Sequence, residues 1–400
     1  MDTRQAIQKD GSARISIVGG GIAGLVAAIS CAENGHPARV MEAHVSLGGR
    51  ARASSDEFVA NFGPHAFYKG RSNGRWLAER ELLPPMVKPS SRGVGFFYAG
   101  KLRRKPPPGL FRALSLLGRR APIEQDFRSW ATRGAGAKAA AMLCAWTVAF
   151  TFDPDPGRLS AAFVWDRMKW IYAPPAVHFV IGGWGELVAR LHERAGALGV
   201  SFAIGTQVEK LPKPPLIVAC EMEQARHLLG ERDLCWEGAD AVLLDIGLLS
   251  RRGDPAVVLD LVDDGALVER YSAVDPSLAP AGAELIQAHT GIGGERSAEL
   301  GVRRIEEILD ACFVGWRERV LWRRRQLSRR RTGALDLPGH SWRQRPAVER
   351  GEGVFVAGTR MPPPASSRRS PSKVPSALLC SPVDGAMPPD HDLKRHPDPQ

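Results

Sequence analysis

Residues 15–52 read ISIVGGGIAGLVAAISCAENGHPARVMEAHVSLGGRAR, and this stretch decides the fold. A β-branched run, 15–18, enters a glycine cluster, and an apolar helical pattern follows over 25–31. A second strand pattern then ends on Glu42. Three glycines of the cluster fit G-x-G-x-x-G: Gly19, Gly21 and Gly24. A strand, a glycine turn, a helix and a second strand with an acid at its end are the order of a dinucleotide-binding βαβ unit.

Each part of this unit has a chemical task. Gly19 permits the tight turn, Gly21 lets the backbone approach a pyrophosphate, and Gly24 lets the helix pack closely on the strand. The free N–H groups and the positive end of the helix dipole face the phosphates. Glu42 is placed to accept hydrogen bonds from both ribose hydroxyls. The predicted contacts are Gly19, Gly21, Ile22, Ala23, Gly24 and Glu42.

Two alternatives stay open for these residues. The glycines could form a turn in an unrelated α/β protein, and Glu42 could be an ordinary solvated carboxylate. The framing by a strand, a helix and an acid 18 positions beyond Gly24 favours the nucleotide interpretation.

A second glycine segment follows Glu42. The pattern E-A-x-x-x-x-G-G-R-A over 42–51 resembles the second signature of the flavoprotein family that includes amine oxidases, protoporphyrinogen oxidase and phytoene desaturases. In that family the paired glycines pass close to the pyrophosphate and the arginine helps to hold the cofactor. The resemblance implies that Gly48, Gly49 and Arg50 contact FAD. A dehydrogenase that uses only a nicotinamide has no role for this segment.

Two further segments resemble cofactor contacts of the same family. Residues 61–65, NFGPH, look like the strand that passes near the flavin ring, which implies contacts from Gly63 and Pro64, with an unliganded turn as the alternative. His65 could touch the substrate there, although a structural histidine bonded to backbone is the favoured interpretation. In relatives, the residue matching Val208 meets the adenine through its backbone; a plain core valine is equally open.

The C-terminal part departs from the family pattern. Residues 353–358, GVFVAG, resemble its last signature, a strand ending in Ala-Gly-Asp, and imply a cofactor contact from Gly358. Thr359 stands where the aspartate is expected, and prolines recur through residues 361–400, where the family has a long helix. We expect a disordered tail, and one hypothesis is that it is a frameshifted version of the cofactor-closing helix. Such a chain could bind FAD weakly or not at all.

The expected fold class is α/β, a Rossmann-like FAD/NAD(P)-binding domain with an interleaved α+β substrate domain. Helices are predicted over 137–150, 160–172 and 186–198, and strands over 200–203, 207–211 and 216–220. From about residue 240 to 331 the pattern predicts strands followed by a long helix. The predicted boundaries are 12–72, 182–238 and 332–360 for the FAD-binding parts, and 73–181 and 239–331 for the substrate domain.

Composition bounds the class of protein. The six cysteines are scattered without C-x-x-C or metal-ligand spacing, which is typical of reduced thiols in a cytoplasmic protein. No apolar core of a signal peptide precedes Ile15, and the apolar stretch 139–150 is too short to span a bilayer. We therefore expect a cytoplasmic protein, at most attached to a membrane surface.

Residues 316–331, WRERVLWRRRQLSRRR, form the most basic stretch, with eight arginines and one glutamate. Such a segment could lie on an anionic membrane, which would suit a lipophilic substrate. It could also bind nucleic acid nonspecifically, but no nucleic-acid module accompanies it, and we expect no specific nucleic-acid partner. A solvated helix face is the favoured interpretation.

The resemblance implies an FAD-dependent oxidoreductase of the phytoene desaturase or protoporphyrinogen oxidase type. Such an enzyme transfers a hydride from a lipophilic or polycyclic substrate to flavin N5. The residues identify no catalytic side chain, no nucleophile–base pair and no metal cluster. Two alternatives remain: an amine oxidase, and an inactive, cofactor-deficient homologue.

Overall fold

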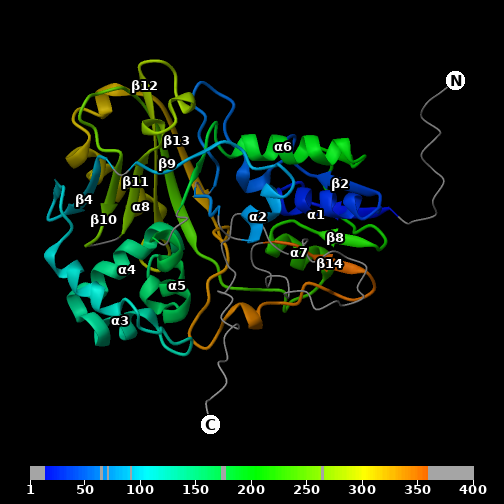
Figure 1. Cartoon of the computed structure of the whole chain (residues 1–400), viewed down its shortest axis with the longest axis horizontal. Helices are drawn as coiled ribbons and strands as arrows, with labels where there is room; N and C mark the ends of the chain where they lie inside the picture. Colours follow the sequence, from blue (N-terminus) through cyan, green and yellow to red (C-terminus); the bar gives the residue numbers. More distant parts are fainter. Residues whose placement is uncertain are drawn as a thin grey trace, which may run out of the picture.

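The computed structural model describes residues 14–63, 66–69, 72–90, 92–172, 177–262 and 265–358. These residues build two main sheets, which lie on opposite sides of the molecule (Figure 1). The predictions made for Pro64, His65, Thr359 and residues 361–400 concern positions outside the described residues.

The first sheet is parallel throughout, and its five strands come from distant parts of the chain. In spatial order they are β14 (Val354–Val356), β8 (Leu216–Val218), β1 (Ile15–Val18), β2 (Ala38–Glu42) and β7 (Ser201–Ile204). The apolar residues of the central strands β1 and β8 are buried because helices cover both faces of the sheet. The carboxyl ends of β1 and β2 lead directly to the glycine segments, so the sheet positions the predicted cofactor contacts.

Helices fill the space around this sheet. Helix α1 (Ile22–Glu33) and helix α6 (Trp184–Ala197) share one apolar core with β1 and β2. Helix α7 (Met222–Leu229) packs in a second core with β8 and β14. A short helix, α2 (Ser72–Ala78), and a two-stranded pair, β3 (Met86–Val87) with β6 (Phe179–Val180), complete this side.

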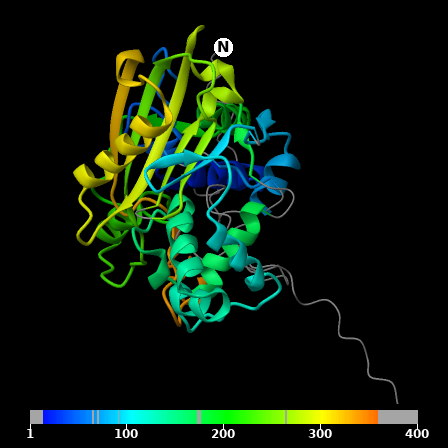
Figure 2. The ribbon, with the colours of Figure 1, turned by 90° about the vertical axis from the view of Figure 1, so that its left-hand side faces the viewer.

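The second sheet has seven strands and is mostly antiparallel. In spatial order they are β13 (Val320–Ser328), β9 (Asp240–Leu249), β12 (Ala283–Ile292), β11 (Ala266–Arg270), β10 (Val257–Asp260), β4 (Val94–Tyr98) and β5 (Lys101–Arg103). Helix α8 (Ala298–Cys312) covers one face. Helices α3 (Phe127–Ala135), α4 (Ala137–Thr151) and α5 (Ala161–Tyr172) form a cluster at one end of the sheet (Figure 2).

The predicted α/β fold class is confirmed, and so are the helices expected over 137–150, 160–172 and 186–198. Strands β7 and β8 confirm two of the three strands expected between residues 200 and 220. The domain boundaries stay predictions. Among the described residues, no helix combines the length and apolar composition needed to cross a bilayer.

Two predicted elements are wrong. Residues 207–211 form no strand, because the chain leaves the first sheet at Gly205 and passes into a loop. Residues 320–328, expected within a long helix, form strand β13. Their side chains alternate between half-buried and exposed along the strand, which is the period of a sheet. The high polar content hid this alternation, because three of the five inward-facing positions are polar: Arg324, Gln326 and Ser328.

Candidate cofactor site

The turn between β1 and α1 contains two glycines that packing requires. Gly19 has φ +108°, and an added Cβ would lie 2.7 Å from the carbonyl oxygen of Ala219. A Cβ on Gly24 would lie 1.9 Å from the carbonyl oxygen of Gly19. These distances are far below van der Waals contact, so the fold itself explains both glycines.

Gly21 differs, because neither packing nor backbone strain requires a glycine there. Its φ is −71°, an ordinary value, and an added Cβ would meet no described atom nearer than the Gly48 carbonyl oxygen at 3.9 Å. Gly21 is the N-cap of α1, with no side-chain cap, and the first turn of the helix contains no acidic residue. The space beside it therefore faces the first N–H groups of the helix, belonging to residues such as Ile22 and Ala23, and the positive end of the helix dipole.

The second glycine segment lies directly against the first. Gly48 donates its N–H to the carbonyl oxygen of Gly20 at 2.8 Å, and Gly21 and Gly48 form a parallel bridge. Gly48 and Gly49 have φ of +110° and +54°, which favour glycine. We call Gly21, Gly48 and Gly49 the glycine cradle. Two segments that lie more than twenty residues apart in the chain thus form one backbone surface at the N-terminus of α1.

Glu42 lies at the end of β2, beside this cradle. Its carboxylate is 7% exposed and accepts two backbone hydrogen bonds, from Gly20 at 2.7 Å and from His44 at 2.8 Å. The interpretation as an ordinary solvated carboxylate does not hold, because both oxygens are fixed by the backbone. Each oxygen keeps acceptor capacity, which suits neighbouring hydroxyl groups.

Arg50 and Gly63 lie close together beside the glycine cradle. A Cβ on Gly63 would lie 2.4 Å from the Arg50 carbonyl oxygen, so the chain passes very close to Arg50 there. The guanidinium of Arg50 donates to the carbonyl oxygen of Arg331, where the chain returns from the second sheet. The chain segments that contain Arg50, Gly63 and Arg331 therefore converge beside the cradle.

Val208 and Gly358 are less constrained. Val208 is half-buried against the apolar core around β8, two residues beyond Thr206, whose N–H bonds the Glu42 carbonyl oxygen at 2.7 Å. A Cβ on Gly358, just past β14, would meet no described atom within 4 Å. Their contacts with a cofactor stay predictions.

A row of polar side chains, which the sequence patterns did not predict, crosses the second sheet. Four residues at matching positions on β11, β12, β9 and β13 form it: Glu269, Gln287, Asp245 and Arg324. We call them the polar row. The first three are at most 7% exposed. Within β9 and β12 they interrupt long apolar runs, which is the signal that could have revealed them.

Asp245 is the acceptor at the centre of the polar row. It accepts hydrogen bonds from Arg324 Nε at 2.9 Å, Gln326 Nε2 at 2.6 Å and Gln287 Nε2 at 2.8 Å. Burial raises the pKa of Asp245 above its ordinary value, while the Arg324 guanidinium and the amide donors act in the opposite direction. The charge of the buried pair is thus compensated within the sheet.

The polar row holds the segment that leads to Gly63. Arg324 Nη2 donates to the carbonyl oxygens of Ala60 and Asn61, both at 3.0 Å, and its guanidinium lies 4.2 Å from the ring centroid of Phe62. Asn61 Oδ1 in turn accepts the N–H of Trp184, the first residue of α6, at 2.9 Å. The two sheets are therefore joined by buried polar contacts next to the candidate site.

Glu269, at the other end of the row, makes stability depend on pH. Burial raises the pKa of Glu269 from 4.5 to about 7, against an opposing hydrogen bond with Tyr271. The folded chain then keeps this proton where the unfolded chain loses it, so the free energy of unfolding falls as the pH rises from 4.5 to 7. The expected loss is about 3 kcal/mol. Urea unfolding below and above this range should show the loss in the wild-type chain and a smaller one in Glu269→Gln; equal losses in both would contradict the assignment.

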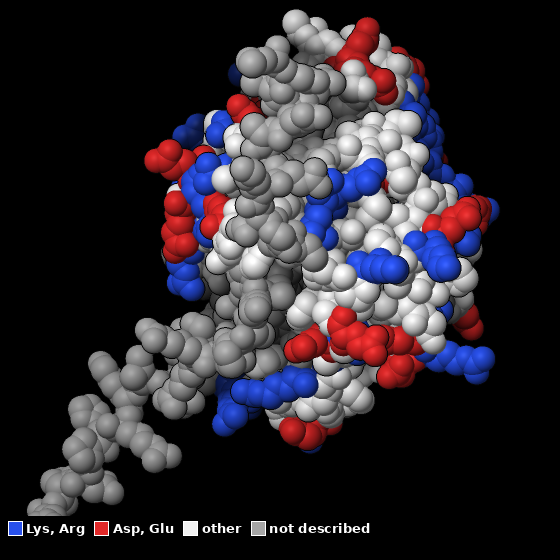
Figure 3. Space-filling model, turned by 90° about the vertical axis from the view of Figure 1, so that its right-hand side faces the viewer, with Lys and Arg blue, Asp and Glu red and all other residues white. Residues whose placement is uncertain are grey.

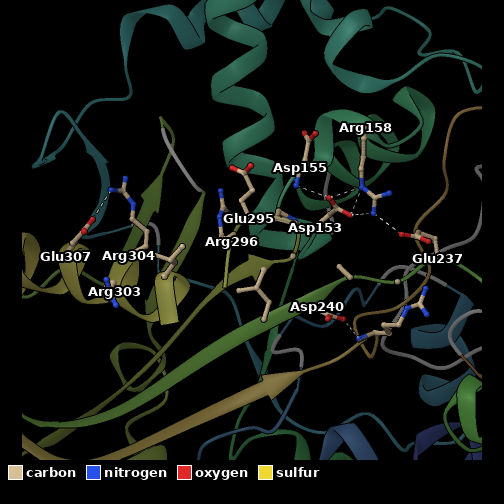
Figure 4. Close-up of a pocket in the computed structure, with 18 residues that line it drawn as sticks. Asp153, Asp155, Arg158, Glu237, Asp240, Glu295, Arg296, Arg303, Arg304 and Glu307 are labelled. Carbon is tan, nitrogen blue, oxygen red and sulfur yellow. Dashed lines mark hydrogen bonds and ion pairs between the residues drawn. The ribbon is translucent and has the colours of Figure 1, made fainter. Parts of the chain in front are cut away.

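A cavity of about 990 Å³ is lined by residues of β9, α8 and the connection between α4 and α5 (Figure 4). Many charged side chains line it, and several of them neutralise one another. Arg158 binds Asp153 at 2.6 Å and Glu237 at 2.9 Å, and Arg304 binds Glu307 at 3.1 Å. None of the predicted cofactor contacts lines this cavity, so it does not replace the cradle as the cofactor site.

The parallel sheet and the glycine cradle define an α/β protein with a Rossmann-like domain. A family model for an NAD(P)-binding Rossmann-like domain matches residues 17–78. No curated protein sequence matches the chain significantly. The match confirms the Rossmann-like domain that the N-terminal motif predicts.

Solved structures extend the likeness over most of the chain. An oxidoreductase from Methanosarcina mazei has a TM-score of 0.72 and 16% identity, covering 87% of this chain and 95% of its own. A protein assigned as a protoporphyrinogen oxidase from Exiguobacterium has a TM-score of 0.64 and 15% identity, covering 88% and 94%. Cyclohexylamine oxidase from Brevibacterium oxydans has a TM-score of 0.65 and 14% identity, covering 87% and 93%. The fold that the predicted resemblance implies is confirmed by these structures.

Proposed function

We propose that the chain is an FAD-dependent oxidoreductase and that FAD binds along the glycine cradle. The observation that carries the proposal is the empty surrounding of Gly21 at the N-terminus of α1. Packing requires glycine at positions 19 and 24. At Gly21 the fold would tolerate a side chain, and a bound pyrophosphate would explain why glycine stands there.

Each of these segments would hold a different group of FAD. The first N–H groups of α1 and the backbone of Gly48–Gly49 would hold the pyrophosphate, and Glu42 would accept the ribose hydroxyls. Arg50 and Gly63 would continue the site toward the second sheet, with Val208 and Gly358 at its margins. When bound, FAD would supply a hydride acceptor.

For the substrate we propose a lipophilic or polycyclic molecule, held between the cofactor and the second sheet. The sequence of residues 61–65 and the likeness to the protein assigned as a protoporphyrinogen oxidase support this class of substrate. The likeness to cyclohexylamine oxidase supports an amine as the alternative.

Anaerobic mixing of the flavin-loaded chain with each substrate class tests this proposal. We expect a lipophilic polycyclic substrate to bleach the visible flavin absorbance and amines to leave it unchanged. Bleaching by amines, with hydrogen peroxide released on admitting air, would favour the amine oxidase instead. A chain that holds flavin but is reduced by neither class would contradict the proposed activity.

A second candidate is a cofactor-deficient homologue. The sequence supports it, because Thr359 replaces the expected aspartate and the residues after it depart from the family pattern. This candidate shares the fold and is distinguished by flavin binding alone.

A further inference from the structure

The arginines of residues 316–331, the most basic stretch, are mostly bound to the chain's own acids. Arg323 pairs with Glu306, and Arg325 pairs with Glu299 at 2.8 Å, both acids being on α8. Further pairs are Arg317–Asp310, Arg319–Asp254 and Arg324–Asp245. These cations therefore have less to offer a partner than the sequence suggests.

Residues 101–120 form a second basic stretch, and its cations are exposed. They span β5, at the edge of the second sheet, and a 3₁₀ helix, Pro108–Leu116. They contain seven Lys and Arg and no acidic residue, and all seven side chains are exposed. Within the described part of the chain, none of the seven forms an ion pair. We call residues 101–120 the basic segment.

The 3₁₀ helix sorts its apolar residues into two rows, because side chains three apart lie over one another. One row, formed by Leu110, Ala113 and Leu116, packs against the α3–α4 core. The next row, Phe111 and Leu114, continues to Leu117 just past the helix and points outward. These three are 61%, 60% and 63% exposed. We call them the apolar ridge.

Cations flank the apolar ridge on both sides along the chain. Lys101, Arg103, Arg104 and Lys105 precede it, Arg112 lies within it, and Arg119 and Arg120 follow it. In Figure 2 the basic segment runs down the outside of the molecule, from the cyan edge strands to the helical cluster. On the face shown in Figure 3, by contrast, acidic and basic side chains are interspersed.

We propose that the basic segment docks on an anionic lipid surface. The apolar ridge would enter the boundary between headgroups and acyl chains, and the flanking cations would bind the negative headgroups. A nucleic acid or an acidic protein would use the charges but leave three large apolar side chains without a role. The inference goes beyond the proposed function and needs no bound flavin.

Sedimentation of the full chain with lipid vesicles tests the proposal. We expect binding to vesicles that contain phosphatidylglycerol and little binding to phosphatidylcholine alone. The triple variant Arg103→Gln, Arg104→Gln, Lys105→Gln should lose on the order of 100-fold in affinity, because each cation contributes about fivefold. The variant Phe111→Ser, Leu114→Ser, Leu117→Ser should lose at least about tenfold. All three positions of this variant are exposed, so we expect it to fold as the wild-type chain does, and circular dichroism checks the fold.

The matched control is Arg323→Gln, Arg325→Gln, which removes exposed but paired arginines and should bind as the wild-type chain does. Three outcomes would overturn the proposal. The wild-type chain could fail to bind anionic vesicles. The control could lose binding instead, which would place the contact at residues 316–331. The ridge variant could bind normally while the charge variant does not, which would indicate a purely electrostatic polyanion site.

Discussion

A Gly21→Ala chain is expected to fold as the wild-type chain does and to lose on the order of 100-fold in affinity for FAD. The built Cβ lies no closer than 3.9 Å to any described atom, and φ of −71° suits alanine. The methyl group would therefore be tolerated by the fold but would occupy the approach to α1 that a pyrophosphate needs. Fluorescence titration with FAD measures the loss, and thermal unfolding without cofactor verifies the fold.

Two other glycines sharpen this experiment. Gly196, exposed near the end of α6 with no described atom within 4 Å of an added Cβ, is the matched control, and Gly196→Ala should leave FAD affinity unchanged. Gly24→Ala should instead destabilise the fold itself, because its Cβ would lie 1.9 Å from a carbonyl oxygen. If Gly21→Ala binds FAD as well as Gly196→Ala does, the cradle is not the pyrophosphate site.

Asp245→Ala is expected to lower the free energy of unfolding by about 3–5 kcal/mol, because it leaves the buried Arg324 guanidinium without its counter-charge. Asp245 is fully buried and the Arg324 side chain is 17% exposed, so little solvent screens the pair. Gln287 and Gln326 lose a shared acceptor at the same time. Urea unfolding of the purified chain measures the change.

The pair Arg323–Glu306 provides the comparison, because it lies one position along the same strand on the other face. Its side chains are 40% and 22% exposed. Glu306→Ala should therefore cost no more than about 1 kcal/mol. Similar costs for the two variants would mean that the polar row does not hold the sheets together as described.

The sequence could predict the first strand, glycine turn and helix because their signals are local. The strand, glycine turn and helix over 15–33 follow from neighbouring residues, and the structure places the Gly48–Gly49 segment against them as expected. Spacing alone could not separate the tasks of the glycines. Only three-dimensional neighbours, such as Ala219 beside Gly19, show which of them serves packing and which leaves space.

The polar row could not be predicted, because its partners are far apart in the chain. Asp245 and Arg324 are 79 residues apart and meet only through the register of β9 and β13. A composition rich in arginine suggested a solvated helix there. The alternation over 320–328 was present in the sequence. Because Arg324 and Gln326 face inward, however, the polar residues did not mark one exposed face of the strand.

The measurement that tests the central claim most directly is a titration of the purified full chain with FAD, followed by visible absorbance and flavin fluorescence. We expect a yellow protein, or a colourless one that takes up one FAD per chain with a saturable change in fluorescence. A chain that carries no flavin and shows no saturable change on adding FAD would contradict the account. It would identify a protein that has kept the fold and the glycine turn without the cofactor.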